Sequence, residues 1–329
     1  MTALSSGAPT GLARRTRSEV VRDHLDLVRA PAVLSVVGDT LAGSAAAGHA
    51  LTPRRALLPL ASACLYAGGM ALNDYADRHL DALERPERPI PSGRVTEQRA
   101  LRVAVGLTAA GVGLAAAGGG RRALAVAVPL AASVWTYDTV AKDRPVGPVV
   151  MAACRGLDVL MGAGVGHLRA ALPAAAGLAV HTAGVTLVSR GEVHGTTPSL
   201  AAGVAAGTLA VAGTVVAGAV REGRPSGPDH PAEAVPRAGQ VARVAAVASS
   251  LAYLATCLPR QVDAAITPSA GNAFAATKAG IRAMVPLQAA WAARGGSLAS
   301  VAVLGGVGLA GRLLRRAGRR PGRVEMSET

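Results

Sequence analysis

Long runs of apolar residues without any charged side chain dominate the chain. Five windows contain no Asp, Glu, Lys or Arg, namely 56–73, 103–120, 170–189, 196–220 and 244–259. About 20 apolar residues in an α-helix cross the hydrocarbon core of a bilayer. The pattern therefore predicts membrane-spanning helices. Charge-free runs of this length, repeated in series, argue against an alanine-rich soluble helical protein.

The same pattern gives a set of candidate spans and the flanking segments. We expect spans at about 28–48, 56–72, 99–118, 121–137, 147–167, 170–189, 199–220, 238–258, 272–293 and 297–313. Charged residues interrupt or flank the ninth, so the count is nine or ten. The predicted fold class is an all-α integral membrane protein. Its transmembrane domain covers residues 28–313, between an N-terminal segment (1–27) and a basic tail (314–329) that are both expected to be disordered.

The net charge of +14 over 329 residues raises the question of a nucleic-acid partner. The arginines, however, gather at the termini and in short segments between the apolar windows, which is typical of positive charge kept on the cytoplasmic side. We therefore expect no nucleic acid and a multi-pass protein of a prokaryotic-type cytoplasmic membrane. With the N-terminus inside, the polar segments 73–98, 138–146 and 190–198 all lie on the cytoplasmic face, and the loop 221–237 lies outside.

Three carboxylates follow the second apolar window. Asp74, Asp77 and Asp81 are three and four residues apart, so on a helix they share one face. Carboxylates so close together repel each other, and hard cations such as Mg²⁺ bind carboxylate oxygens together with substrate phosphates. The spacing is equally compatible with a solvated, charge-balanced loop, and taken alone it leaves both interpretations open.

The residues around these aspartates carry a resemblance. Asn73-Asp74-x-x-Asp77-x-x-x-Asp81, followed by Arg-Pro-x-Arg-Pro-Ile-Pro-Ser-Gly-Arg at 85–94, resembles the first aspartate-rich motif of the UbiA prenyltransferase superfamily. The resemblance implies about nine helices around a central cavity in the membrane. It also implies Mg²⁺-dependent transfer of an isoprenyl group from an isoprenyl diphosphate to a lipophilic or aromatic acceptor. It assigns catalysis and metal binding to Asp74, Asp77 and Asp81, and substrate binding to Asn73 and Arg88.

A second segment is also similar to the family. Tyr137-Asp138-x-x-x-Lys142-x-Arg144 resembles the place after the fourth span where the family has a tyrosine and a basic residue near the diphosphate. The resemblance implies that Lys142 and Arg144 bind substrate, because a cation there offsets the charge of the leaving group.

The third segment departs from the family pattern. Most members have a second aspartate-rich motif after the sixth span, but the segment Ser189 to Gly195 contains a single carboxylate, Glu192, and the opposite charge of Arg190. Three interpretations are open: Glu192 and His194 bind one metal ion, Arg190 binds a phosphate in place of the metal, or the second metal site has been lost together with prenyl transfer. The segment resembles a subgroup called EboC-like, whose members are linked to export of small metabolites. The alternative function is therefore a non-catalytic UbiA-fold protein that binds or helps to export a prenylated or aromatic metabolite.

Three further charged residues inside predicted spans are functional candidates. Asp39 lies in the first span, where a carboxylate is costly and is a functional candidate by default. It would orient an acceptor hydroxyl or bond the backbone of a neighbouring helix. Arg155 and Asp158 lie three residues apart in the fifth span, and the simplest expectation is that they pair with each other. The alternative is that Arg155 faces the cavity near the diphosphate.

Overall fold

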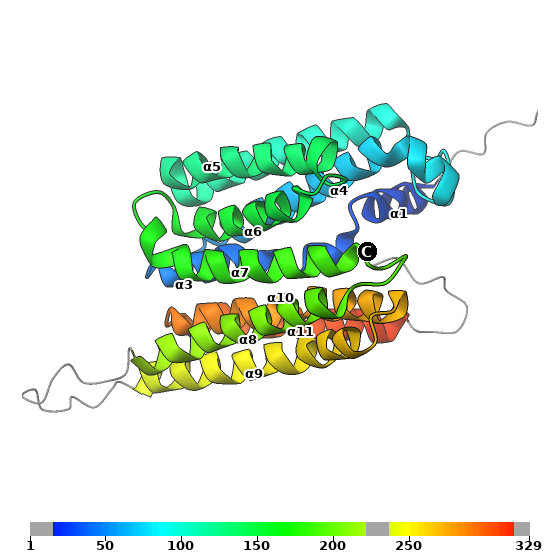
Figure 1. The fold of residues 1–329 in the computed structure, drawn as a ribbon. Coiled ribbons are helices and arrows are strands. Elements are labelled where there is room, and N and C mark those ends of the chain that lie inside the picture. The colour runs from blue at the N-terminus through cyan, green and yellow to red at the C-terminus, as the bar shows by residue number, and fades with distance from the viewer. Residues whose placement is uncertain (1–15, 222–236, 319–329) are drawn as a thin grey trace, which may run out of the picture.

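The computed structural model describes residues 16–221 and 237–318, and all regular structure within these ranges is helical. Figure 1 shows long helices running side by side. The elements are α1 (Arg17–Leu27), α2 (Ala30–Val33), α3 (Val37–Ala46), α4 (Leu57–Glu84), α5 (Glu97–Thr136), a π-helical turn η1 (Tyr137–Ala141), α6 (Gly147–Ala163), α7 (Leu168–Ser189), α8 (Pro198–Arg221), α9 (Arg237–Ile266), α10 (Ala270–Arg294) and α11 (Leu298–Gly318).

Each of the ten predicted spans corresponds to a helix, or to part of one, in the described residues. The third and fourth spans lie in the single element α5, whose backbone leaves helical geometry at Gly120 (φ 65°, ψ −160°). A glycine tolerates this positive φ, so the break divides α5 into two antiparallel halves of spanning length. By length and composition, four described elements are apolar enough to cross a membrane: residues 97–141 and helices α7, α8 and α9.

The prediction for the two ends of the chain is wrong in part. Residues 17–27 were expected to be disordered, yet they form α1, which Thr16 and Glu19 close with a reciprocal capping box. The Arg94 side chain forms salt bridges with two aspartates of this helix, with its Nη1 atom 3.0 Å from Asp23 Oδ1 and 2.9 Å from Asp26 Oδ2. At the other end α11 continues to Gly318, and residues 1–15 and 319–329 lie outside the described residues, as does most of the loop expected outside the membrane.

Helix α3 occupies the centre of the packing, in contact with α4, α6, α7, α10 and α11. Small residues bring α3 and α6 together. A Cβ atom added to Gly43 would lie 1.8 Å from the Val159 carbonyl oxygen, and one added to Gly162 would lie 2.1 Å from the Thr40 carbonyl oxygen. The backbones can approach this closely only because both positions lack side chains, which is how helices in lipid commonly associate.

The three polar segments meet at one end of the helices. Lys142, just after η1, donates a hydrogen bond to Asp77 on α4. Arg190, at the end of α7, donates one to the Arg144 carbonyl oxygen. These contacts join 73–98, 138–146 and 190–198 on one face, as the predicted topology requires. That this face is cytoplasmic stays a prediction.

Candidate functional site

The aspartates lie on the last turns of α4, which continues without a break from the apolar window to Glu84. The predicted shared helical face is therefore confirmed. Asp74 and Asp81 are buried, each with 3% of its surface exposed, and Asp77 is partly buried. The helix ends where Arg85 and Pro86 begin the proline-rich loop, because proline cannot continue the backbone hydrogen bonding.

Arg88 joins the two buried carboxylates. Its Nη1 atom lies 2.8 Å from Asp81 Oδ2 and 3.4 Å from Asp74 Oδ1. The loop that carries Arg88 folds back on itself, since Ser92 donates both its backbone N–H and its hydroxyl to the Arg88 carbonyl, and Gly93 takes a positive φ of 71°. The predicted substrate-binding arginine thus lies within the aspartate cluster.

A second arginine reaches Asp74 from the beginning of the chain. Arg29 Nη2 lies 3.5 Å from Asp74 Oδ1. Arg29 is also the one described non-glycine residue with a positive φ, 46°, at the N-cap of α2. Such conformations cost free energy and cluster at functional sites. Sequence reasoning missed Arg29 because it stands 45 residues before Asp74, at the edge of a predicted span.

Lys142 is the third cation of the cluster. It contacts the Asp77 carboxylate and lies 3.4 Å from the Asn73 side-chain oxygen, and the Asn73 amide donates to Asp77 Oδ2 at 3.1 Å. Asn73, Asp77 and Lys142 therefore form one hydrogen-bonded group. Two of the three polar segments expected to act together are directly connected here.

Asp138, on η1, was part of the recognised segment but received no role. It is 2% exposed, and its Oδ1 atom is buried without a hydrogen-bond partner among the described residues. Its Oδ2 atom would lie 3.3 Å from a Cβ atom on Gly69 of α4. A buried, unpartnered carboxylate oxygen beside Asp77 and Lys142 is a costly arrangement, and it makes Asp138 a further candidate oxygen donor.

Burial raises the pKa of Asp74 above its ordinary value, an effect that Arg29 and Arg88 oppose and that Asp81 and Asp77 reinforce. Asp74 therefore holds its proton to a higher pH than an exposed aspartate does. Loss of that proton is favoured by a further positive charge in the cluster.

The donor set fits a hard divalent cation, although the side chains are not gathered around one. Among the described residues, no group of three or more His, Cys, Asp and Glu side chains is close enough to hold a metal ion. The carboxylates of α4 contact Arg29, Arg88 and Lys142 instead. All the candidate donor atoms are oxygens, which suits Mg²⁺, and Asp138 supplies a free one.

Among the described residues, no hydrogen bond or salt bridge joins the altered third segment to the three aspartates. Glu192 lies near Thr277 and Lys278 of α10 and near Arg85, and its Oε1 atom is buried without a hydrogen-bond partner among the described residues. Burial raises the pKa of Glu192. His194 is exposed, and Arg190 is committed to the backbone of the 144–147 turn. Arg144 offers its carbonyl to Arg190, while its own side chain is exposed.

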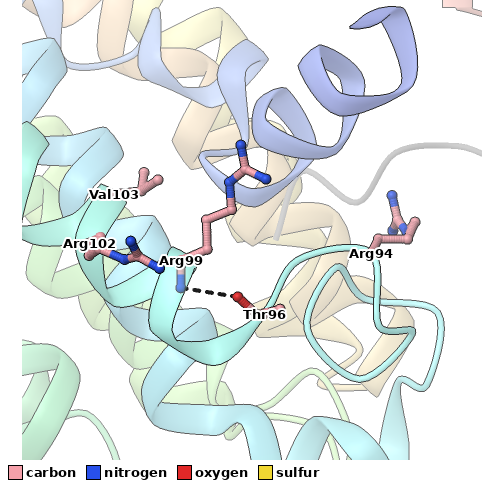
Figure 2. A pocket seen from close by; sticks show the side chains of 5 residues that line it. All are labelled: Arg94, Thr96, Arg99, Arg102 and Val103. Atoms are coloured by element: carbon pink, nitrogen blue, oxygen red, sulfur yellow. Dashed lines mark hydrogen bonds between the residues drawn. The ribbon is translucent and has the colours of Figure 1, made fainter. Parts of the chain in front are cut away.

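A basic hollow adjoins the aspartate loop. It has a volume of about 580 Å³ and is lined by Arg94, Thr96, Arg99, Arg102 and Val103, as Figure 2 shows. None of the three aspartates lines it. Arg99 and Arg102 lie at the start of α5, and Arg94 lies in the loop that precedes it.

The intramembrane arginine pairs differently from the sequence expectation. Arg155 contacts Asp39 on α3 rather than Asp158, its neighbour on α6. Asp158 accepts a hydrogen bond from Ser62 of α4. The helical spacing suggested a local pair, but the tertiary packing of α3 against α6 brings a closer partner.

The fold and the site define a multi-helix integral membrane protein with an acidic and basic cluster at one end of its helices. A model of the UbiA prenyltransferase family matches residues 36–220, more than half of the chain, so the protein belongs to this family. The EboC-like subgroup stays a prediction.

Curated relatives are similar over part of their length. Digeranylgeranylglyceryl phosphate synthase of Methanopyrus kandleri is 39% identical over 152 residues, which cover 45% of this chain and 54% of that protein. The enzyme of the same name from Ignicoccus hospitalis is 42% identical over 91 residues, 28% of this chain and 30% of that protein. The chain thus matches about half, or less, of the length of these relatives.

Solved structures share the fold. A structure of digeranylgeranylglyceryl phosphate synthase superposes with a TM-score of 0.56 at 16% identity, over 85% of this chain and 100% of that one. A UbiA homologue from Archaeoglobus fulgidus bound to DMAPP and Mg²⁺ gives a TM-score of 0.55 at 17% identity, and the match covers 85% of this chain and 99% of that one. At this level of identity the likeness establishes the architecture alone.

Proposed function

We propose that this protein is an intramembrane prenyltransferase that moves an isoprenyl group from an isoprenyl diphosphate to a lipophilic or aromatic acceptor, with Mg²⁺ as cofactor. The observation that carries the proposal is the pairing of Asp74, Asp77 and Asp81 with three cations where the first two polar segments meet. Such a cluster can receive a metal and an anion together, because carboxylates and cations are both present and balanced.

Asp74, Asp77 and Asp81 would hold Mg²⁺, with Asp138 as a further oxygen donor. The metal, when bound, would offset the charge of the diphosphate and assist its departure. With the carboxylates engaged by Mg²⁺, Arg29, Arg88 and Lys142 would be available to contact phosphate oxygens, and Asn73, which donates a hydrogen bond to Asp77, would orient that carboxylate. Charge-assisted contacts of this kind stabilise a leaving group strongly in a site that excludes water.

Arg144 and Arg190 are proposed to extend this positive surface toward the third segment. Glu192 is the remaining candidate metal ligand, and its unpartnered Oε1 atom supports that role. Because a single carboxylate replaces the usual motif, the second metal would be held less tightly than the first.

The acceptor is the least constrained part of the proposal. The curated relatives are named as synthases of a glyceryl phosphate lipid, and an acceptor of that class carries an anionic group. The basic hollow of Arg94, Arg99 and Arg102 could take such a group at the membrane surface. Lipid acceptors with a phosphate therefore belong in the first assays, beside aromatic ones.

A non-catalytic role is the alternative, and one observation favours it. Glu192 lies near Thr277 and Lys278 of α10, and the Arg190 side chain donates a hydrogen bond to the Arg144 carbonyl of the second polar segment. In that case the protein would bind or help to export a small prenylated or aromatic metabolite without cleaving a diphosphate.

The test is diphosphate release by the purified full-length protein in detergent, with isoprenyl diphosphates of several lengths and with acceptors of both classes. We expect Mg²⁺-dependent release that falls by about 100-fold or more in Asp74→Ala and Asp77→Ala. The matched control is Asp263→Asn, which removes an exposed carboxylate paired with Arg260 on α9.

Release that survives both aspartate substitutions would rule out the proposed metal role. Absence of release with every donor, together with measurable Mg²⁺-dependent donor binding, would favour the binding or export function instead.

A further inference from the structure

A discontinuity in the first span organises a second polar group inside the membrane domain. Helix α2 ends at Val33 and α3 begins at Val37, and carbonyl groups of this break accept hydrogen bonds from side chains of other helices. The Ser35 carbonyl accepts hydrogen bonds from Gln288 Nε2 at 2.8 Å and from Arg155 Nη1 at 3.3 Å. The Val36 carbonyl accepts one from the Ser62 hydroxyl at 3.3 Å.

Two carboxylates complete this group. Asp39 is fully buried, contacts Arg155, and accepts a hydrogen bond from Gln288 at 2.7 Å. Asp158 is 6% exposed and accepts the hydrogen bond of Ser62, while its Oδ1 atom is buried without a hydrogen-bond partner among the described residues. Both carboxyls belong to the same break, because Ser62 also donates to the Val36 carbonyl and Arg155 also donates to the Ser35 carbonyl.

The charges of this group do not balance when both carboxyls are ionised. Within the part of the chain that the structure describes, Arg155 is the one guanidinium that forms a salt bridge with this pair of carboxyls, so one negative charge would remain uncompensated. The other titratable groups near the pair or Arg155 are Tyr66 of α4, Cys154 of α6 and His181 of α7. Of these only a histidine can become a cation, and both ring nitrogens of His181 are hydrogen-bonded to other groups, Tyr253 and the Gly280 carbonyl. An uncompensated charge at this depth is very unfavourable.

The group is distinct from the aspartate cluster. Ser62 and Asp74 are twelve residues apart on the continuous helix α4, which is about 18 Å at the rise of an α-helix. Asp158 therefore lies well inside a hydrocarbon core about 30 Å thick. It is too far from the aspartates to act on the carbon next to the diphosphate, so the proposed transferase chemistry does not use it.

We propose that Asp39 and Asp158 form an intramembrane proton-binding site, in which the two carboxyls share one proton. One proton on the pair makes the group neutral with Arg155, and the buried, unpartnered Oδ1 atom of Asp158 is a place for it. Loss of the proton would leave one carboxylate with an uncompensated negative charge, which another cation would have to offset at the α2–α3 break. Charged groups beside broken helices serve proton and ion binding in membrane transport proteins.

The test is infrared difference spectroscopy of the full-length protein in detergent, which detects the carbonyl stretch of a protonated carboxyl. We expect the difference between wild type and Asp158→Asn to contain a carboxylic-acid band that shifts in D₂O and is present at neutral pH. The control Asp263→Asn should give no such band. Asp158→Asn replaces a neutral carboxyl by a neutral amide of the same shape, so it should fold with an unfolding temperature close to that of wild type.

A difference spectrum that contains only carboxylate bands would overturn the proposal. So would a clear rise in the unfolding temperature of Asp158→Asn, because that result means the substitution removed an uncompensated charge. A carboxylate band that responds to Na⁺ but not to pH would assign the site to a metal cation rather than a proton. None of these readouts depends on transferase activity.

Discussion

Lys142, at the end of η1, contacts the carboxylate of Asp77, which lies 65 residues earlier on α4. This contact holds two polar segments in register at the mouth of the helices. The positive charge of Lys142 also offsets the negative charge of Asp77. Arg29 and Arg88 do the same for Asp74 and Asp81. Each of the three aspartates is therefore paired with at least one cation.

Removal of Arg88 should lower the stability of the folded protein. Arg88→Gln leaves Asp74 and Asp81 buried beside each other without their shared cation, so we expect a loss of about 3 kcal/mol in stability. Thermal unfolding in detergent measures it. Addition of Mg²⁺ should restore more stability to this variant than to wild type. The exposed pair provides the control: Arg260→Gln should change little. Equal losses in both variants would contradict the account.

The close contact of α3 with α6 makes Gly162 intolerant of a side chain. A Cβ atom there would overlap the Thr40 backbone, so Gly162→Ala should lower stability by about 1–3 kcal/mol or more. A Cβ atom on Gly106 of α5 meets nothing within 4 Å, and Gly106→Ala should stabilise its helix by up to about 1 kcal/mol. Denaturation in detergent compares the two. Opposite signs are expected, and a Gly162→Ala variant as stable as wild type would disprove the packing.

The end of the molecule opposite the aspartates carries a pH-sensitive histidine. Burial lowers the pKa of His49, and the nearby Arg55, His167 and Arg122 lower it further, against a hydrogen bond to the Ala163 carbonyl. The unfolded chain, with a histidine pKa of about 6.5, therefore binds this proton before the folded protein does. The stabilising contribution is complete above that pH and is lost as the pH falls below it.

Unfolding temperatures between pH 7.5 and 5 test this linkage. We expect the decline of wild type to be shallower in His49→Gln, while His79→Gln, at an exposed position on α4, should leave the slope unchanged. A slope that does not respond to His49→Gln would show that other groups control the acid sensitivity.

The predicted topology can be tested with single cysteines at exposed positions. Ser92→Cys and Val193→Cys lie in the first and third polar segments, and Ala50→Cys lies between α3 and α4 at the other end. In a background without the three natural cysteines, an impermeant thiol reagent should label the first two from the cytoplasmic side and the third from the outside. Labelling of Ser92→Cys and Val193→Cys from opposite sides would be incompatible with the fold.

Much of the architecture could be predicted from the sequence, because hydropathy reports directly which segments are long enough to cross lipid. The ten expected spans and the helical continuity of Asp74 with Asp81 both have counterparts in the structure. The break of the first span into α2 and α3 was not foreseen, since no proline or glycine stands between Leu34 and Val36 to signal it.

The site was predictable only where the chemistry is local. The motif spacing located the aspartates, Asn73, Arg88 and Lys142, which the structure brings together. Arg29 and the Asp39–Arg155 pair depend on contacts between helices distant in sequence, and no spacing rule reports them. Whether Glu192 acts with the aspartates is likewise a question of tertiary distance, and its neighbours in the structure are residues of α10 and Arg85.

The central claim is that the aspartate cluster binds an isoprenyl diphosphate together with Mg²⁺. Isothermal titration of the purified protein with an isoprenyl thiodiphosphate, with and without Mg²⁺, measures this directly. Wild type and Asp263→Asn should bind only when Mg²⁺ is present, and Asp77→Asn should bind at least about 10-fold more weakly, a loss of about 1.4 kcal/mol. Equal affinity in Asp77→Asn, or binding that does not depend on Mg²⁺, would contradict the account.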